Sequence, residues 1–228
     1  MEGFDFLVEV SRTSRKKSAS IELTGRGVTV TVPESLSDKQ ISDLVTKRSA
    51  WIKSKLQEQA EQPGYRAREY VSGETFPYLG KNYRLKIRKD DLPSVKLKHG
   101  YLTVTLAEVT SQQAIKNLVE NWYASHALNQ LRGKTVRLAK EIGVSPRKVS
   151  VKTYKRRWGS CSSDGDIFYN WRIILAPHRI VDYVVIHELC HLRRHDHSSE
   201  FWRLVKHYAP DFEDRRGWLK QNSRTLDL

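Results

Sequence analysis

The pattern His187-Glu188-Leu189-Cys190-His191 places two histidines four residues apart, with a glutamate directly after the first. Because an α-helix completes a turn about every 3.6 residues, both imidazoles would project from one face and could share one metal ion. The segment also carries an apolar stripe at helical spacing, formed by Val181, Val184, Val185, Leu189 and Leu192. The pattern therefore predicts a buried helix over about 178–194 that presents metal ligands.

A catalytic zinc ion needs three protein ligands and one open position. The third ligand must come from outside the turn that carries His187 and His191. We expect it to be His197, because the chain could end the helix, reverse over Asp196 and Ser198, and return an imidazole to the metal. Three other residues stay open as alternatives: His195, Glu200 and Glu213. The predicted cofactor is one zinc ion per chain.

Glu188 lies beside the two histidines, where it could accept a proton instead of binding the metal. Zinc lowers the pKa of a bound water to about 7, so the resulting hydroxide could attack a carbonyl or phosphoryl centre. The developing negative charge needs a positive or hydrogen-bonding partner. The sequence offers four candidates for such transition-state or substrate contacts, namely Tyr154, Arg157, Tyr169 and His178, and it does not choose between them.

The remaining chain predicts an α+β fold, with strands, interleaved helices and a helical end. Strands are expected over 4–10, 19–23, 28–32, four segments within 71–106 with a hairpin turn at His99-Gly100, 148–154 and 166–173. Helices are expected over about 38–60, 111–142, 198–208 and 212–222, besides the metal-binding one. We expect a strand-rich N-terminal region with one helix over 1–108 and a zincin-like metal-binding catalytic domain over 109–228.

Gly159, between Trp158 and two small residues, allows two interpretations. The first is a strand that another group approaches closely, as at a substrate-lining edge. The second is a tight turn that packs Trp158 into the core. The sequence favours neither.

The net charge of +14 and a pI near 9.8 point to an anionic ligand, such as a nucleotide or nucleic acid, or to a basic solvated surface. Only two cysteines occur, Cys161 and Cys190, so a disulfide-rich secreted protein is excluded. The N-terminus shows no signal-peptide pattern, and no apolar run approaches the roughly 20 residues that span a bilayer. We therefore expect a cytoplasmic protein without a membrane partner.

Several segments together resemble the YgjP-like metallopeptidase family and, more distantly, SprT-like peptidases. They are Arg157-Trp158-Gly159-Ser160-Cys161-Ser162, Asn170-Trp171-Arg172, Pro177, Asp182-Tyr183-Val184-Val185, His187–Leu192, and His197-Ser198 followed by Phe201-Trp202. The resemblance is dense over 157–208. It implies zinc bound by His187, His191 and His197, a catalytic Glu188 and a compact peptidase-like core. A nucleoside triphosphate (UTP) pyrophosphatase activity has also been ascribed to the family.

Three functional hypotheses follow. The first is a zinc hydrolase that cleaves peptide bonds. The second is the same centre acting on a phosphoanhydride, which the positive charge would suit. The third is a nucleic-acid-associated binding protein with a structural metal, although such a site would need no general base beside it.

Overall fold

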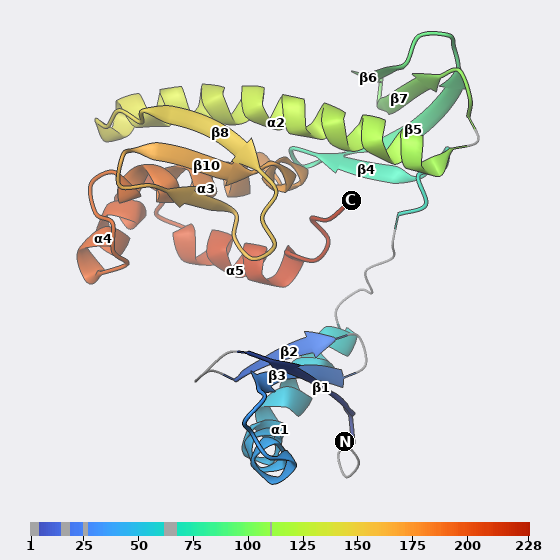
Figure 1. The fold of residues 1–228 in the computed structure, drawn as a ribbon. Helices are drawn as coiled ribbons and strands as arrows, with labels where there is room; N and C mark the ends of the chain where they lie inside the picture. Colours follow the sequence, from blue (N-terminus) through green and yellow to red (C-terminus); the bar gives the residue numbers. More distant parts are fainter. Residues whose placement is uncertain (1–4, 15–18, 25–26, 62–67, 110) are drawn as a thin grey trace. The chain divides into compact units, whose positions relative to one another are not determined.

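The computed structural model describes residues 5–14, 19–24, 27–61, 68–109 and 111–228, and Figure 1 shows their helices and strands. The chain divides into two compact units, Met1–Arg66 and Ala67–Leu228. Both units contain strands and helices, which confirms the α+β class. None of the helices in the described ranges is long and apolar enough to cross a membrane.

The first unit is a three-stranded sheet with one helix. Strands β1 (Leu7–Thr13) and β2 (Ser20–Thr24) flank β3 (Gly27–Pro33), β1 in parallel and β2 antiparallel. Helix α1 (Asp38–Glu61) begins with a capping box, in which the Ser37 hydroxyl accepts from the Gln40 N–H at 3.3 Å and the Gln40 side-chain oxygen accepts from the Ser37 N–H at 3.0 Å. The apolar core includes valines of β3 and one face of α1: Val28, Val30, Val32, Ile41, Val45 and Ile52. Phe4, where one expected strand begins, lies outside the described residues.

The second unit opens with a four-stranded sheet in the order β4-β5-β7-β6. Its strands are β4 (Thr75–Tyr78), β5 (Lys81–Lys89), β6 (Ser94–Lys98) and β7 (Tyr101–Leu106). His99 and Gly100, which join β6 to β7, have φ angles of 50° and 81°. Two consecutive positive φ angles are typical of a two-residue type I′ hairpin turn, and the predicted hairpin is confirmed.

Helix α2 (Gln112–Ile142) runs past this sheet at one end and past a second sheet at the other (Figure 1). It begins at the N-cap Ser111 and ends at Gly143, whose φ of 73° is the left-handed conformation that glycine adopts without strain. The second sheet has the order β8-β10-β9, with β8 (Lys148–Lys152) parallel and β9 (Gly159–Cys161) antiparallel to β10 (Asp166–Asn170).

The strand expected over 166–173 ends early. The Asn170 side chain accepts from the Arg172 N–H and begins a 3-10 helix, η1 (Trp171–Leu175). Helix α3 (His178–His191) ends before the expected residue 194, where the N–H groups of Leu192 and Arg193 bond three residues back, to the Leu189 and Cys190 carbonyls, and tighten the last turn. Helices α4 (Ser199–Tyr208) and α5 (Phe212–Asn222) complete the chain as expected.

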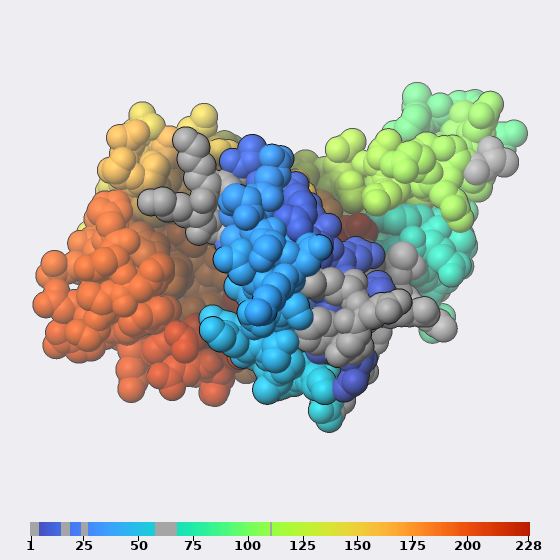
Figure 2. Space-filling view, turned by 60° about the horizontal axis from the view of Figure 1, so that its bottom comes forward, coloured from blue at the N-terminus to red at the C-terminus, as the bar shows by residue number. Residues whose placement is uncertain are grey.

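One hydrophobic core joins all parts of the second unit. It extends from Tyr70 and Phe76 through Trp122 of α2 to Leu228. Figure 2 shows the atoms of β4–β7 (teal to green) at the right of the view and those of α4 and α5 (orange to red) at the left. The four strands therefore share the core of 111–228, whereas the sequence suggested grouping them with the N-terminal region. The extent of the catalytic domain, 109–228, stays a prediction.

Candidate metal centre

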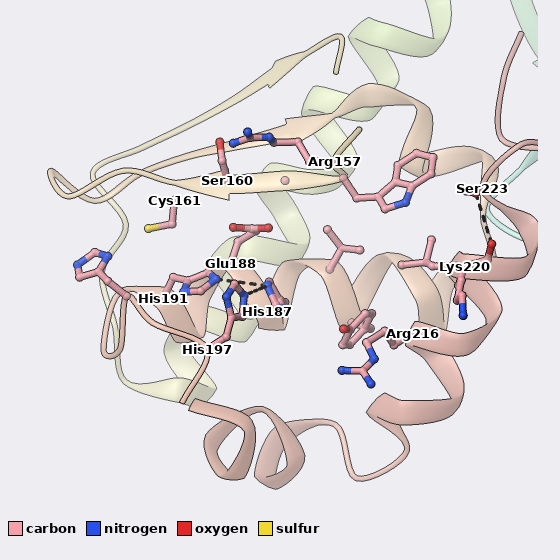
Figure 3. A pocket seen from close by; sticks show the side chains of 16 residues that line it. Arg157, Ser160, Cys161, His187, Glu188, His191, His197, Arg216, Lys220 and Ser223 are labelled. Atoms are coloured by element: carbon pink, nitrogen blue, oxygen red, sulfur yellow. Dashed lines mark hydrogen bonds between the residues drawn. The ribbon is translucent and has the colours of Figure 1, made fainter. Parts of the chain in front are cut away.

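Helix α3 packs its apolar residues into the core and carries two histidines, His187 and His191, that line a pocket (Figure 3). The Nε2 atoms of His187 and His191 lie 3.3 Å apart. His197, from the segment between α3 and α4, brings its Nε2 to 3.2 Å from that of His187. In the part of the chain that the structure describes, these three residues form a group whose ligand atoms all lie within 4.8 Å of one another.

This geometry fits a tetrahedral metal ion. With zinc–nitrogen bonds of about 2.0–2.1 Å, two ligands of a tetrahedral site lie roughly 3.3 Å apart, close to both Nε2–Nε2 distances. The His191 Nδ1 lies 3.0 Å from the Arg194 carbonyl and can only donate to it, which leaves the Nε2 lone pair free for a metal. Three converging lone pairs repel one another unless a cation or proton lies between them.

Burial also prepares the histidines to bind a cation. Desolvation, followed by the neighbouring His191 and His197, lowers the pKa of His187 to about 3. Desolvation lowers the pKa of His191 as well. Both rings are therefore neutral near pH 7, and a neutral imidazole is the form that binds metals.

The segment that returns His197 is fixed by a short hydrogen-bonded turn. The Asp196 carboxylate accepts from the Ser198 hydroxyl at 2.8 Å and from its N–H at 3.3 Å, and the Ser198 hydroxyl caps α4. Glu200, one alternative ligand, instead pairs with Arg194 at 2.7 Å. His195 lines the pocket, but neither it nor Glu213 belongs to the three-histidine group.

Glu188 is nearly enclosed, with 5% of its surface exposed. Desolvation raises the pKa of its carboxyl to about 8, while the positive charge of Arg157 opposes the shift. Strand β9 covers it so closely that a Cβ atom on Gly159 would lie 2.5 Å from Glu188 Oε1. The interpretation of Gly159 as a strand residue that another group approaches closely is therefore confirmed.

A pocket of about 590 Å³ opens in front of the histidines and Glu188. Loop and strand residues 157–161, helix α3 and helix α5 line it. Glu188 is the one acidic residue among its lining residues, against three permanent cations: Arg157, Arg216 and Lys220.

Of the four predicted substrate contacts, only Arg157 lines this pocket. Tyr154 lies one contact away, with its hydroxyl 2.8 Å from that of Ser160. Tyr169 faces the core, where its hydroxyl lies 3.1 Å from that of Thr135, and burial raises the pKa of the phenol. His178 is exposed at the start of α3, nine residues and roughly 13 Å of helix before His187.

The sequence patterns did not indicate that α5 and Tyr183 contribute to the pocket. Tyr183 lies one turn before His187, lines the pocket, and has a pKa raised by burial. On α5 the lining residues recur at helical spacing (Arg216, Leu219, Lys220 and Ser223), a signal present in the sequence. Nothing in the sequence, however, shows which helix faces a distant metal site.

Comparisons with known proteins connect this sequence to an enzyme family. The family model of the YgjP-like metallopeptidase domain matches residues 17–222. A solved structure titled as the crystal structure of the metallopeptidase zymogen of Pyrococcus abyssi abylysin is 26% identical, with a TM-score of 0.33, and the match covers 37% of this chain and 90% of that chain. No curated protein matches the sequence.

A family match over residues 17–222 covers nearly the whole chain, including the three-histidine group, Glu188 and the α5 pocket wall. It confirms the resemblance seen in the motifs and indicates a metallopeptidase-type hydrolase. The chain belongs to the YgjP-like family, whose matching model describes a metallopeptidase domain.

Proposed function

We propose that the protein is a zinc-dependent metallopeptidase in which His187, His191 and His197 hold the metal and Glu188 is the general base. The observation that carries the proposal is the convergence of three Nε2 atoms beside a buried carboxylate. A zinc ion held there would supply Lewis acidity, polarising a carbonyl and acidifying water.

The protein's own residues would handle the proton. In the metal-free protein, burial raises the pKa of Glu188 to about 8, and the charge of a bound zinc ion would lower it from there, toward the operating pH at which a general base works best. Gly159 leaves room for the carboxylate in one position, since β9 lies directly against it. Glu188 would take a proton from the attacking water and later deliver it to the leaving amine.

The pocket wall also suits an extended peptide. Strand β9 lies at the edge of its sheet and, among the described strands, pairs only with β10. A free strand edge can add a peptide through main-chain hydrogen bonds. Asn170 supports the loop before β9, because its side-chain amide donates to the Tyr154 and Arg157 carbonyls at 3.0 Å and 3.4 Å.

The test is Glu188→Gln, which keeps the shape of the side chain and removes the base. We expect the variant to retain its metal and lose peptide turnover. Glu200→Gln is the matched control, because Glu200 is exposed and does not line the pocket, so it should keep both. Undiminished turnover in Glu188→Gln, or loss of its metal, would refute the assigned role.

A second candidate is hydrolysis of a nucleoside triphosphate at the same centre, favoured by the three cations in the pocket. Assays of one metal-loaded preparation on peptides and on nucleoside triphosphates separate the two functions. A cytoplasmic location and a nucleic-acid partner stay predictions.

A further inference from the structure

Helix α5 forms the wall of the pocket beside the three histidines (Figure 3). Arg216 and Lys220 lie four residues apart, so they share a helix face with Leu219 and Ser223. Like charges at this spacing repel each other, which disfavours the helix unless an anion lies between them. The wall therefore combines two cations with an apolar surface.

The two cations of this wall find no counter-ion among the residues that the structure describes. Among the described residues, neither Arg216 nor Lys220 forms an ion pair, whereas the neighbouring Arg215 pairs with Asp211 at 2.6 Å. The positive charge of this wall is thus left for a ligand.

Aromatic packing holds Arg216 close to the metal ligands. Its guanidinium carbon lies 5.1 Å from the centre of the Trp202 ring, a cation–π distance. Trp202 in turn stacks on His197, with ring centres 5.7 Å apart and an angle of 27° between the planes. Trp202 also stacks on Phe212, with ring centres 5.3 Å apart and an angle of 19° between the planes.

We propose that Arg216, assisted by Lys220, binds a carboxylate of the peptide substrate immediately beside the bond that is cleaved. This inference rests on the proposed peptidase function. A guanidinium presents paired donors that match the two oxygens of a carboxylate, and Leu219 and Val184 line the same pocket for the adjoining methylene groups. The carboxylate could belong to an acidic side chain or to the C-terminus of the peptide.

The experiment uses the metal-loaded full-length protein. A peptide library with mass-spectrometric readout first locates the cleavage site, and matched peptides then carry Glu, Gln or Lys at each flanking position, with free or amidated C-termini. We expect kcat/KM for a free carboxylate at one position to exceed that of its neutral counterpart by about tenfold or more, the value of a charge-assisted hydrogen bond. If the acidic side chain gives the higher kcat/KM, the bound carboxylate belongs to a side chain. If the free C-terminus gives it, the bound carboxylate is that of the peptide C-terminus.

Variants assign the preference to α5. Arg216→Ala should reduce the preference to about twofold or less, with the rate on the neutral peptide reporting whether the centre is intact. Arg216→Glu should favour Lys at that position. Arg203→Ala removes an exposed cation of α4 that does not line the pocket, so it should leave the preference unchanged.

Three results would overturn the inference. Cleavage of neutral and acidic peptides at equal rates would refute the carboxylate site but not the peptidase function. A preference for the carboxylate that survives Arg216→Ala would do the same. Cleavage of no peptide would refute the proposed function and the inference with it. Hydrolysis of nucleoside triphosphates that depends on Arg216, without any peptide preference, would assign the cations to phosphate.

Discussion

Replacement of Gly159 by alanine should displace the carboxylate of Glu188, the proposed base, without disturbing the fold of the protein. The new Cβ would lie 2.5 Å from Glu188 Oε1 and 2.7 Å from Cδ and Cγ. Non-bonded carbon atoms prefer separations of about 3.5–4.0 Å, so the carboxyl group must shift by roughly 1 Å. The backbone of Gly159 does not have a positive φ, and the atoms in the way belong to one side chain.

A displacement of about 1 Å in a catalytic group can cost about 100-fold in rate, or about 2.7 kcal/mol of transition-state stabilisation. We therefore expect Gly159→Ala to lower kcat on a cleaved peptide by about 100-fold while zinc content stays at the wild-type level. The assay is steady-state cleavage of a fluorogenic peptide, with metal analysis of the same sample. Combined with Glu188→Gln, the alanine should cause no further loss, since both changes act on one group.

Gly133→Ala is the matched control, because among the described residues nothing outside its own helical backbone and chain neighbours lies within 4 Å of its added Cβ, and Gly133 does not line the pocket. It should keep wild-type turnover. Wild-type turnover in Gly159→Ala, or an additional loss in the double variant, would show that the position of Glu188 does not control the rate.

Three further predictions concern the ligands, the buried carboxyl and the core. His197→Ala should lose zinc on dialysis and His195→Ala should keep it; the opposite pair of metal contents would move the third ligand to His195. In the metal-free protein, the raised pKa of Glu188, from 4.5 to about 8, means that the unfolded chain releases a proton which the native state retains, so stability falls as pH rises between these values. Urea unfolding should therefore show Glu188→Gln gaining stability over wild type from about pH 5 to pH 8, and a constant difference would exclude a buried, protonated Glu188. Tyr169→Phe should cost about 1 kcal/mol of unfolding free energy and leave kcat unchanged, because it breaks only the contact with Thr135; a large loss of kcat would place the phenol in the site.

Local patterns predicted the elements of the fold well. Alternation in β3, the hairpin at His99-Gly100 and the apolar stripe of α3 each depend on residues close in sequence, and all three are present. The predictions were wrong at the ends of elements, where β10 and α3 stop earlier than expected. The 3-10 helix after Asn170 and the early end of α3 depend on single hydrogen bonds that periodicity does not reveal.

The grouping of the candidate site's residues was predictable where they lie on one short segment. His187, Glu188 and His191 follow from helical spacing, and His197 from the length of the turn that returns it. Tyr169 could not be placed, because whether it faced the core or the pocket depends on how β10 packs on α2. Arg216 and Lys220 were missed since only the tertiary fold brings α5 beside α3.

X-ray absorption at the zinc edge of the metal-loaded protein would reveal whether three histidines hold the metal. We predict one zinc ion per chain with three imidazole nitrogens and one further light atom at about 2.0–2.1 Å, the arrangement of an open catalytic site. A sulfur ligand at about 2.3 Å, or four protein ligands that close the site, would contradict it.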